Sequence, residues 1–319
     1  MTTSSSDVVS EAQAVLAAPG RVSHVVVASI RHGGEAIVRG LACGLPRLVR
    51  AVAARAPDAE LSCVIGFSYD GWLRVAGRTA PSGMRPFEPV YGVTQTAPAS
   101  PGDLILHVRT ASRGLCFELV TRVVGELRDA VRVELEVQAF RSLDNRSLLG
   151  FVEDGDNPTG AVAAEVALIG AADPEHAGGS FVLAQTFLHD LPAWDRLHVC
   201  EQERVVGRDK LLNTPLPGHD ADRHRRRRHQ APQLLRQSMA FGSPALGEFG
   251  TVTVAYAGSP DVLEASVRTR FVGVPLGTYD PLLDFSTAMS GGLFYVPPTV
   301  ELRGLATPRG VRQPPVEVA

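Results

Sequence analysis

The chain has 319 residues, of which 45% are hydrophobic and 20% are charged, as in a globular protein that buries a substantial core. Its net charge of −3 and its pI of about 6.3 exclude a general electrostatic attraction to nucleic acid or to a membrane surface. The four cysteines are widely spaced and lack zinc-ligand spacing, so we expect reduced thiols. With no signal-peptide pattern and no apolar run of membrane-spanning length, the sequence predicts a cytoplasmic protein.

The first half of the chain contains two predicted strand–helix–strand units. Apolar and β-branched patterns predict strands over 24–30, 61–67, 103–110 and 131–140, and helices over 37–54 and 113–127. The alternation of period two is clearest in VRVELEVQAF, residues 131–140. This order is β-α-β followed by β-α-β.

The second half repeats that order more weakly. Strands are predicted over 180–190 and 250–258, and helices over 191–208 and 261–273. The pattern predicts an α+β fold of tandem ferredoxin-like halves, with antiparallel sheets and helices packed on one face, similar to the dimeric α/β barrel superfamily. We expect the chain to divide into a disordered N-terminus (1–21), two halves (22–150 and 151–303) and a Pro-rich tail (304–319).

Between the halves lies an acidic, turn-rich loop, GFVEDGDNPTG, residues 150–160, with three carboxylates. Alone, such a loop is more often a solvated turn or a calcium-like site than a catalytic one. A second polar loop follows over 213–230 and contains four consecutive arginines, residues 225–228. A short basic loop on an acidic protein is more typical of a solvated surface than of a nucleic-acid site, so no nucleic-acid partner is expected.

Several stretches in the same order resemble the dye-decolorizing peroxidase family, in its bacterial cytoplasmic branch. They are GFSYDGWLRV (66–75), MRPFEPV (84–90), PGDLILHVRTASRGLCFEL (101–119), the acidic loop, GGSFVLAQTFLHDLPAWDRLHVCEQERVVGR (178–208), LLRQSMAFGS (234–243) and LLDFSTAMSGGLFYVPP (282–298). The resemblance extends over about residues 24–298. It implies a haem peroxidase built from two ferredoxin-like halves, with haem b in the C-terminal half.

The resemblance implies a distal carboxylate above the haem, supplied by the acidic loop. The family pattern is an Asp-Gly pair followed by Asn-Pro, and here Glu153 precedes Asp154 while Asn157 opens the Asn-Pro pair. When the loop is aligned with the family motif without a gap, the distal acid falls on Glu153. When the Asp-Gly pair is matched instead, it falls on Asp154. We favour Asp154 because the shorter acid before Gly preserves the turn. Asn157 is counted among the cofactor-binding residues. The motif LLRQSMAFGS places the family's distal arginine at Arg236, with Ser238 where many relatives carry Asn.

On the proximal side the resemblance implies a histidine ligand to the haem iron. The spacing favours His219, which lies seventeen residues before Arg236. The basic residues that follow His224 favour that histidine instead, and we rank it first. His229 is a third candidate in the same loop. Arg227 matches the arginine that approaches a haem propionate in relatives. Asp284 matches the acidic partner of the histidine.

The implied activity is reduction of hydrogen peroxide coupled to oxidation of dyes, phenolic compounds or similar organic reductants. The distal acid would move a proton, and Arg236 would stabilise the negative charge on the departing oxygen. An alternative is a haem-binding or haem-free scaffold with weak or lost activity, because both site loops depart from the family pattern. A homo-oligomer, dimer or hexamer, is expected from the relatives. Packaging in an encapsulin shell is weakly indicated, because the tail lacks the expected Gly-Ser-Leu type of ending.

Overall fold

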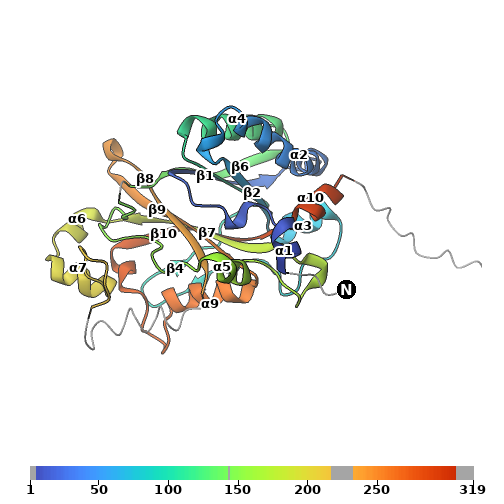
Figure 1. Ribbon diagram of the computed structural model, residues 1–319. Helices are drawn as coiled ribbons and strands as arrows, with labels where there is room; N and C mark the ends of the chain where they lie inside the picture. The colour runs from blue at the N-terminus through green and yellow to red at the C-terminus, as the bar shows by residue number, and fades with distance from the viewer. Residues whose placement is uncertain (1–4, 143, 217–232, 307–319) are drawn as a thin grey trace, which may run out of the picture.

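A computed structural model describes residues 5–142, 144–216 and 233–306 of the chain. Within these ranges eight strands close into a barrel in the order β1-β5-β2-β10-β7-β9-β8-β6 (Figure 1). All neighbouring strands of the barrel are antiparallel. The strands are β1 Val22–Ile30, β2 Ser62–Phe67, β5 Leu104–Thr110, β6 Val131–Phe140, β7 Ser180–His189, β8 Leu235–Ser243, β9 Glu248–Ala257 and β10 Ser286–Val296. A separate two-stranded ribbon pairs β3 Val90–Tyr91 with β4 Thr96–Ala97.

Each half of the chain contributes four adjacent strands to this barrel. The N-terminal strands lie in the order β6-β1-β5-β2 and the C-terminal strands in the order β10-β7-β9-β8. Both orders place the fourth strand of a β-α-β-β-α-β unit beside the first, and the third between the first and the second. The two halves meet where Phe67 pairs with Tyr295 and where Phe140 pairs with Ala240. The predicted tandem ferredoxin-like fold is confirmed.

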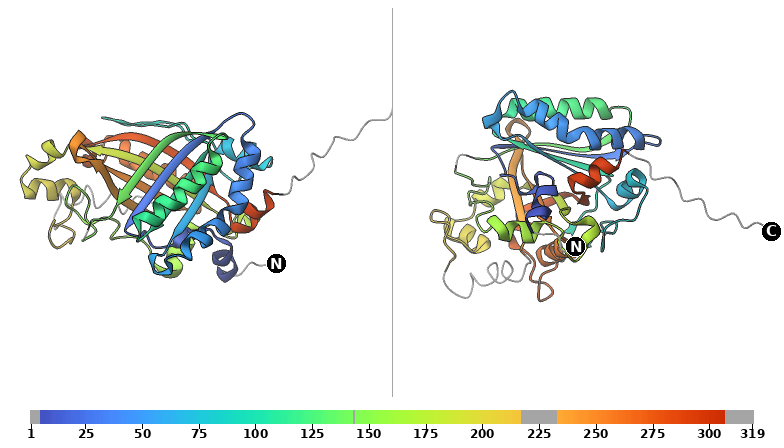
Figure 2. Two further views of the ribbon diagram at one scale, coloured as in Figure 1. Left: turned by 90° about the horizontal axis from the view of Figure 1, so that it is seen from above. Right: turned by 45° about the vertical axis from the view of Figure 1, so that its right-hand side comes forward.

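Helices cover the outer faces of the strands. Two long helices, α2 Glu35–Ala53 and α4 Arg113–Leu127, lie side by side over the N-terminal strands (Figures 1 and 2). On the C-terminal strands this layer is formed by α9 Pro260–Phe271, which contacts β7 and β9. The shorter helices are α1 Ser5–Glu11, α3 Tyr69–Ala76, α5 Gly160–Ala167, α6 Leu191–Asp195, α7 Val199–Val206 and α10 Thr299–Gly304. No helix in the described ranges is long and apolar enough to cross a membrane.

Apolar side chains on both faces of the barrel strands form two cores, one outside the barrel and one inside it. Outward-facing residues such as Val26 and Ile65 pack under the helices, whereas inward-facing residues such as Val25, Val27 and Val64 fill the interior of the barrel. Because successive side chains of a strand point to opposite faces, one strand supplies both cores.

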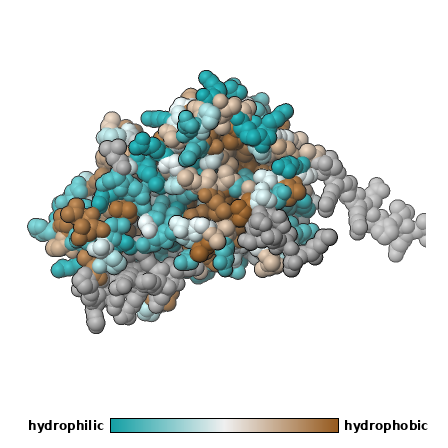
Figure 3. Space-filling model, viewed as in Figure 1, coloured by the Kyte–Doolittle hydropathy of each residue, from teal (hydrophilic) through white to brown (hydrophobic). Residues whose placement is uncertain are grey.

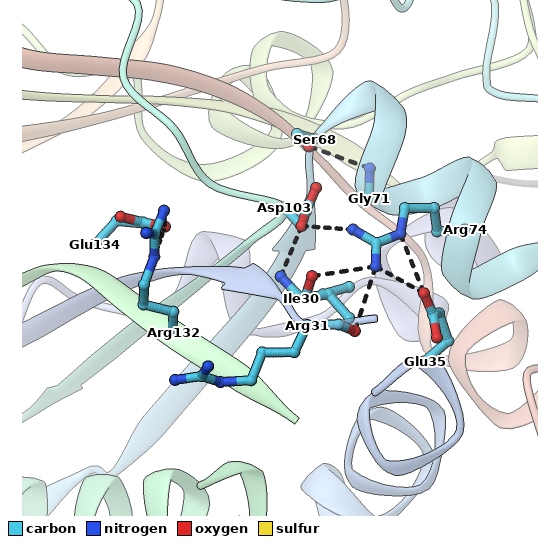
Figure 4. A network of polar contacts seen from close by, with 9 residues as sticks. All are labelled: Ile30, Arg31, Glu35, Ser68, Gly71, Arg74, Asp103, Arg132 and Glu134. Carbon is cyan, nitrogen blue, oxygen red and sulfur yellow. Dashed lines mark hydrogen bonds and ion pairs between the residues drawn. The ribbon is translucent and has the colours of Figure 1, made fainter. Parts of the chain in front are cut away.

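One polar network fastens α3 to the N-terminal sheet (Figure 4). The Arg74 guanidinium contacts the carboxylates of Glu35 at 2.7 Å and Asp103 at 3.0 Å, and it donates to the carbonyl oxygen of Ile30. Asp103 also accepts a hydrogen bond from the backbone N–H of Ile30 at 2.6 Å. The network therefore joins α2, α3 and the end of β1.

The expected disorder of residues 1–21 is wrong for the part that the structure describes. Residues 5–11 form α1, and residues 14–16 form a short 3-10 helix. The Gln13 amide donates to the carbonyl oxygens of Ile65 and Pro297, and its oxygen accepts from the backbone N–H of Ile65. With Val15 fully buried, this polar segment is ordered by contacts that are distant in sequence.

Two other expected boundaries also change. The helix predicted over 191–208 is split into α6 and α7 because His198 adopts extended backbone, and its N–H donates to the side chain of Glu201 to begin α7. The predicted tail begins at 304, yet Leu305 is buried in the apolar core and only residues 307–319 lie outside the description at that end.

Candidate functional site

A cavity of about 200 Å³ lies between the C-terminal strands and α9. Three strands form one wall: β7 supplies Leu183 and Gln185, β9 supplies Thr253 and Ala255, and β8 supplies Arg236 and Ser238, with Leu234 directly before β8. The opposite wall comes from Ser266, Val267, Thr269 and Arg270 of α9, and the acidic loop closes one side. Within each strand the lining residues lie two positions apart, because they share the outward face of the sheet.

The strand pairing aligns these residues in two rows. Arg236 pairs with Ala255, which pairs with Leu183. Two residues further along each strand, Ser238 pairs with Thr253, which pairs with Gln185. One row therefore presents a cation next to small and apolar side chains, and the other presents a series of hydrogen-bonding groups.

The acidic loop is joined to β8 through side chains that take the place of a neighbouring strand. In the register, β6 and β8 pair only at Phe140 and Ala240, so the edge of β8 is not paired with β6 at Arg236. There the Asn157 amide donates to the carbonyl oxygen of Arg236 at 2.5 Å and accepts from its N–H at 3.0 Å. The Asp154 carboxylate accepts from the N–H of Ser238 at 2.7 Å. Loop and strand thus form one unit.

The backbone of Asp154 is left-handed, with φ of +54°. Asp tolerates this conformation better than most residues, because its short side chain can hydrogen-bond locally. Burial raises the pKa of the Asp154 carboxyl, although the Ser238 N–H and hydroxyl and the charges of Arg141 and Arg236 oppose the rise. A carboxyl group of this kind suits proton transfer.

Glu153 also lines the cavity. Its backbone N–H donates to the carbonyl oxygen of Asn145, and the Asn145 amide donates to the carbonyl oxygen of Glu153. The structure therefore brings both candidate acids to the same cavity, together with Arg236 and Ser238. Asn157, counted in the sequence analysis among cofactor-binding residues, is used at both ends of its amide by the backbone of Arg236 and does not line the cavity.

The proximal candidates are placed less completely. His219, His224, His229 and Arg227 lie outside the described residues. Asp284 is exposed, accepts a hydrogen bond from the Tyr279 hydroxyl at 2.9 Å and does not line the cavity. Asp280, four residues earlier, lines the cavity, is 8% exposed and lies 3.6 Å from the Arg270 guanidinium.

Several cavity residues were missed by the sequence analysis, among them Gln185, Thr253 and Asp280. The sequence carried one signal for Gln185, a polar residue inside the apolar strand FVLAQTF. Asp280 stands with Asp284 in the same stretch, YDPLLD, where spacing alone does not show which carboxylate turns inward.

The lining suits a flat, largely apolar cofactor with acidic groups at its edge. Apolar side chains such as Leu149, Phe151 and Leu282 line part of the cavity, and Arg208 and Arg270 provide cations. The Gln185 amide nitrogen is enclosed and has no hydrogen-bond partner in the part of the chain that the structure describes. No cluster of three or more metal-ligating side chains occurs within residues 5–142, 144–216 and 233–306. The residues that line the cavity fit a haem group.

Comparisons with known families and proteins agree with this geometry. Residues 12–141 match the family described as "Dyp-type peroxidase, N-terminal", and residues 144–301 match "Dyp-type peroxidase, C-terminal". The chain is 39% identical over 296 residues to a dye-decolorizing peroxidase of Mycobacterium tuberculosis, covering 89% of this chain and 88% of the relative. A dye-decolorizing peroxidase of Brevibacterium linens is 38% identical over 302 residues, covering 89% and 80%.

Solved structures are also similar to this fold. DyPB from Rhodococcus jostii RHA1 superposes with a TM-score of 0.87 at 40% identity, covering 91% of this chain and 97% of that one. A variant of that protein in complex with haem gives a TM-score of 0.88, with 92% and 98% covered. The encapsulated DyP-type peroxidase from Mycobacterium smegmatis gives 0.87 at 38% identity, with 92% and 97% covered.

Proposed function

This chain belongs to the Dyp-type peroxidase family and is a haem-dependent peroxidase, and from that premise we propose how its own residues serve the reaction. The proposed cofactor is haem b, held in the cavity between the outward face of β7, β8 and β9 and helix α9. When bound, haem supplies the iron centre for peroxide reduction and the oxidising equivalents for an organic donor. The observation that carries the proposal is that Asp154 and Arg236 line one cavity and are fixed to the same strand.

Asp154 is the proposed distal base. In its ionised form it accepts a proton from hydrogen peroxide and returns it to the departing oxygen, which leaves as water. Its hydrogen bond from the Ser238 N–H fixes the carboxylate beside the cavity. Glu153 is the alternative acid, and its place in the lining supports keeping it in the test.

Arg236 is the proposed electrostatic partner of that base. Its guanidinium stays charged at all relevant pH values and stabilises the negative charge that develops on the departing oxygen. The two hydrogen bonds between the Asn157 amide and the backbone of Arg236, here called the Asn157 clamp, hold the backbone from which this side chain projects. Ser238 places a hydroxyl where many relatives carry an amide.

We propose His224, or otherwise His219, as the proximal ligand, with Arg227 near a propionate. For the acidic partner of that histidine we propose Asp280 in place of Asp284, because Asp280 is buried and lines the cavity whereas Asp284 is exposed. A carboxylate on the far nitrogen of a ligating imidazole makes the ligand more basic.

The proposed substrates are hydrogen peroxide and an organic one-electron donor such as a dye or a phenol. We also propose a cytoplasmic homo-oligomer. Supporting the oligomer, Figure 3 shows a hydrophobic patch over the region of α6 and α7. In α7 and the segment that follows it, Val199, Leu211 and Leu212 are exposed. The halves 22–150 and 151–303 are kept as the proposed domain division.

The proposed function is tested by the absorption spectrum of the protein expressed with haem, before and after one equivalent of hydrogen peroxide. A Soret band that changes on addition of peroxide, followed by oxidation of an added dye, is the expected result. Protein that takes up haem but oxidises no donor between acidic and neutral pH would contradict it. Substitution of His219 and His224 by Ala, one at a time, identifies the residue on which the Soret band depends.

A further inference from the structure

A row of polar groups leads from the distal acid across the wall of the cavity. Asp154 accepts a hydrogen bond from the N–H of Ser238 at 2.7 Å, and the Ser238 hydroxyl also opposes the rise of the Asp154 pKa. The Ser238 hydroxyl oxygen lies 3.5 Å from that of Thr253, its partner on β9. Thr253 in turn pairs with Gln185 on β7. Side chains opposite each other in an antiparallel pair stand about 5 Å apart, so Gln185 is the next polar side chain of the row after Thr253.

The far end of this row is a buried amide that lacks a partner. Gln185 is only 4% exposed and lines the cavity. Its amide nitrogen donates no hydrogen bond within the described residues, although a buried amide left unpaired costs about 1–3 kcal/mol. Leu183 and Phe187 occupy the neighbouring positions on the same face of β7, so Gln185 is a polar side chain between two apolar ones, at the level of Thr253 and Ser238. A buried donor of this kind calls for a ligand or a water.

We propose that Gln185 is a positioning residue for the peroxide reaction: with Thr253 it fixes a water molecule in the cavity, and this water orients the hydroxyls of Thr253 and Ser238 toward Asp154. The inference rests on the proposed function, because it concerns the base that accepts the proton of peroxide. Each donor in such a series polarises the next, so a row that begins at the Gln185 amide and ends at a carboxylate favours the ionised acid.

Other charged groups around Asp154 set the background for this effect. Arg236 on β8 and Arg141, which follows β6, both favour the carboxylate. Glu153 and Arg208 line the cavity from the loop and from beyond α7, while Arg270 and Asp280 face it from the α9 side. None of these groups is altered by substituting Gln185, so a change in the titration of Asp154 in that variant reports on the row.

The test compares Gln185→Met, which keeps side-chain length but removes the amide, with the wild-type haem-loaded protein. Cyanide is the probe: it arrives as neutral acid and binds iron as the anion, so its association needs a base that takes the proton. The rate of cyanide association, followed at the Soret band, falls as the pH drops and the base becomes protonated. We expect the midpoint of this fall to move up by about one pH unit, a tenfold change in the acid dissociation constant.

Thr253→Val removes a hydroxyl from the same row with little change in volume, and we expect the same upward shift of the midpoint. If Gln185→Met does not bind haem, Thr253→Val provides the test instead. Gln138→Met is the matched control, because Gln138 is exposed on β6, and its profile should equal that of the wild type. A midpoint unchanged in both Gln185→Met and Thr253→Val, in protein that binds haem and cyanide normally, overturns this inference alone. A wild-type chain without a Soret band overturns the proposed function and this inference together.

Discussion

Asn157 holds Arg236 by both backbone groups, donating to its carbonyl oxygen at 2.5 Å and accepting from its N–H at 3.0 Å. The side chain replaces the strand pairing that β8 lacks at this point, because β6 pairs with β8 only at Ala240. The contact connects the acidic loop to the strand that carries Arg236. The positions of Arg236 and Asp154, the two proposed distal groups, therefore depend on a residue that does not itself line the cavity.

We expect Asn157→Ala to leave two backbone groups of Arg236 without partners and to lower the free energy of unfolding by about 1–3 kcal/mol. Because Arg236 and Asp154 would lose their fixed spacing, kcat/KM for hydrogen peroxide should fall by about tenfold or more. Urea denaturation and steady-state kinetics measure the two effects. Asn157→Asp keeps the acceptor and should be less damaging. Wild-type stability in Asn157→Ala would show that the clamp contributes nothing.

The two acids of the loop are distinguished by Asp154→Asn and Glu153→Gln. If Asp154 is the base, the first substitution should lower kcat/KM for hydrogen peroxide by about 100- to 10,000-fold, and the second should have a much smaller effect. Burial raises the pKa of Asp154, and the base acts only when ionised, so activity should fall as the pH drops through this raised pKa. A larger loss in Glu153→Gln would transfer the role to Glu153.

Substitutions of Asp280 and of Asp284 should differ in their effect on the reduction potential of the haem iron. Asp280→Asn removes a buried carboxylate from the cavity wall, and it should raise the reduction potential of the iron, because a less basic histidine stabilises the oxidised metal less. Asp284→Asn, at an exposed position, should leave the potential unchanged. Spectroelectrochemical titration of the two variants measures the difference. The reverse result would restore the assignment made from sequence.

Acid stability should depend on His189. Burial, aided by the charge of Arg270, lowers its pKa to about 4, and its ring nitrogens contact the hydroxyls of Ser286 and Thr251. An unfolded histidine titrates near 6.5, so between pH 6.5 and pH 4 the unfolded chain binds a proton that the folded chain does not. Folding is therefore destabilised as the pH falls through this window, by up to about 3 kcal/mol at its lower end.

His189→Gln should flatten that part of the pH–stability curve, whereas His32→Gln, at an exposed position, should not. Urea midpoints measured at half-unit steps from pH 7 to pH 4 provide the comparison. Parallel curves for the wild type and His189→Gln would contradict the assignment. His107, buried beside Arg109 with its pKa lowered well below the usual value, should produce a similar loss in both proteins.

The sequence by itself determined the barrel strands and the two long helices of the first half and their order, because the signals for them are local. Alternation in β6 and helical spacing in α2 and α4 are contained within single segments, and the paired β-α-β-β-α-β order predicts the topology. The position of Arg236 was likewise available from a contiguous motif. Its assigned role, like those of Asp154 and the histidines, stays a prediction.

Only the tertiary structure decided which distant residues meet. Gln185 and Ser238 reach one row through the register of β7, β9 and β8, which depends on pairing across tens of residues and on packing under α9. The choice between Asp280 and Asp284 depends on how a short 3-10 helix turns against the cavity, and the order of residues 5–16 depends on Gln13 finding partners on β2 and beyond β10. Side-chain contacts between segments far apart in the chain leave no local pattern, because their free energy is gained only after the sheet has closed.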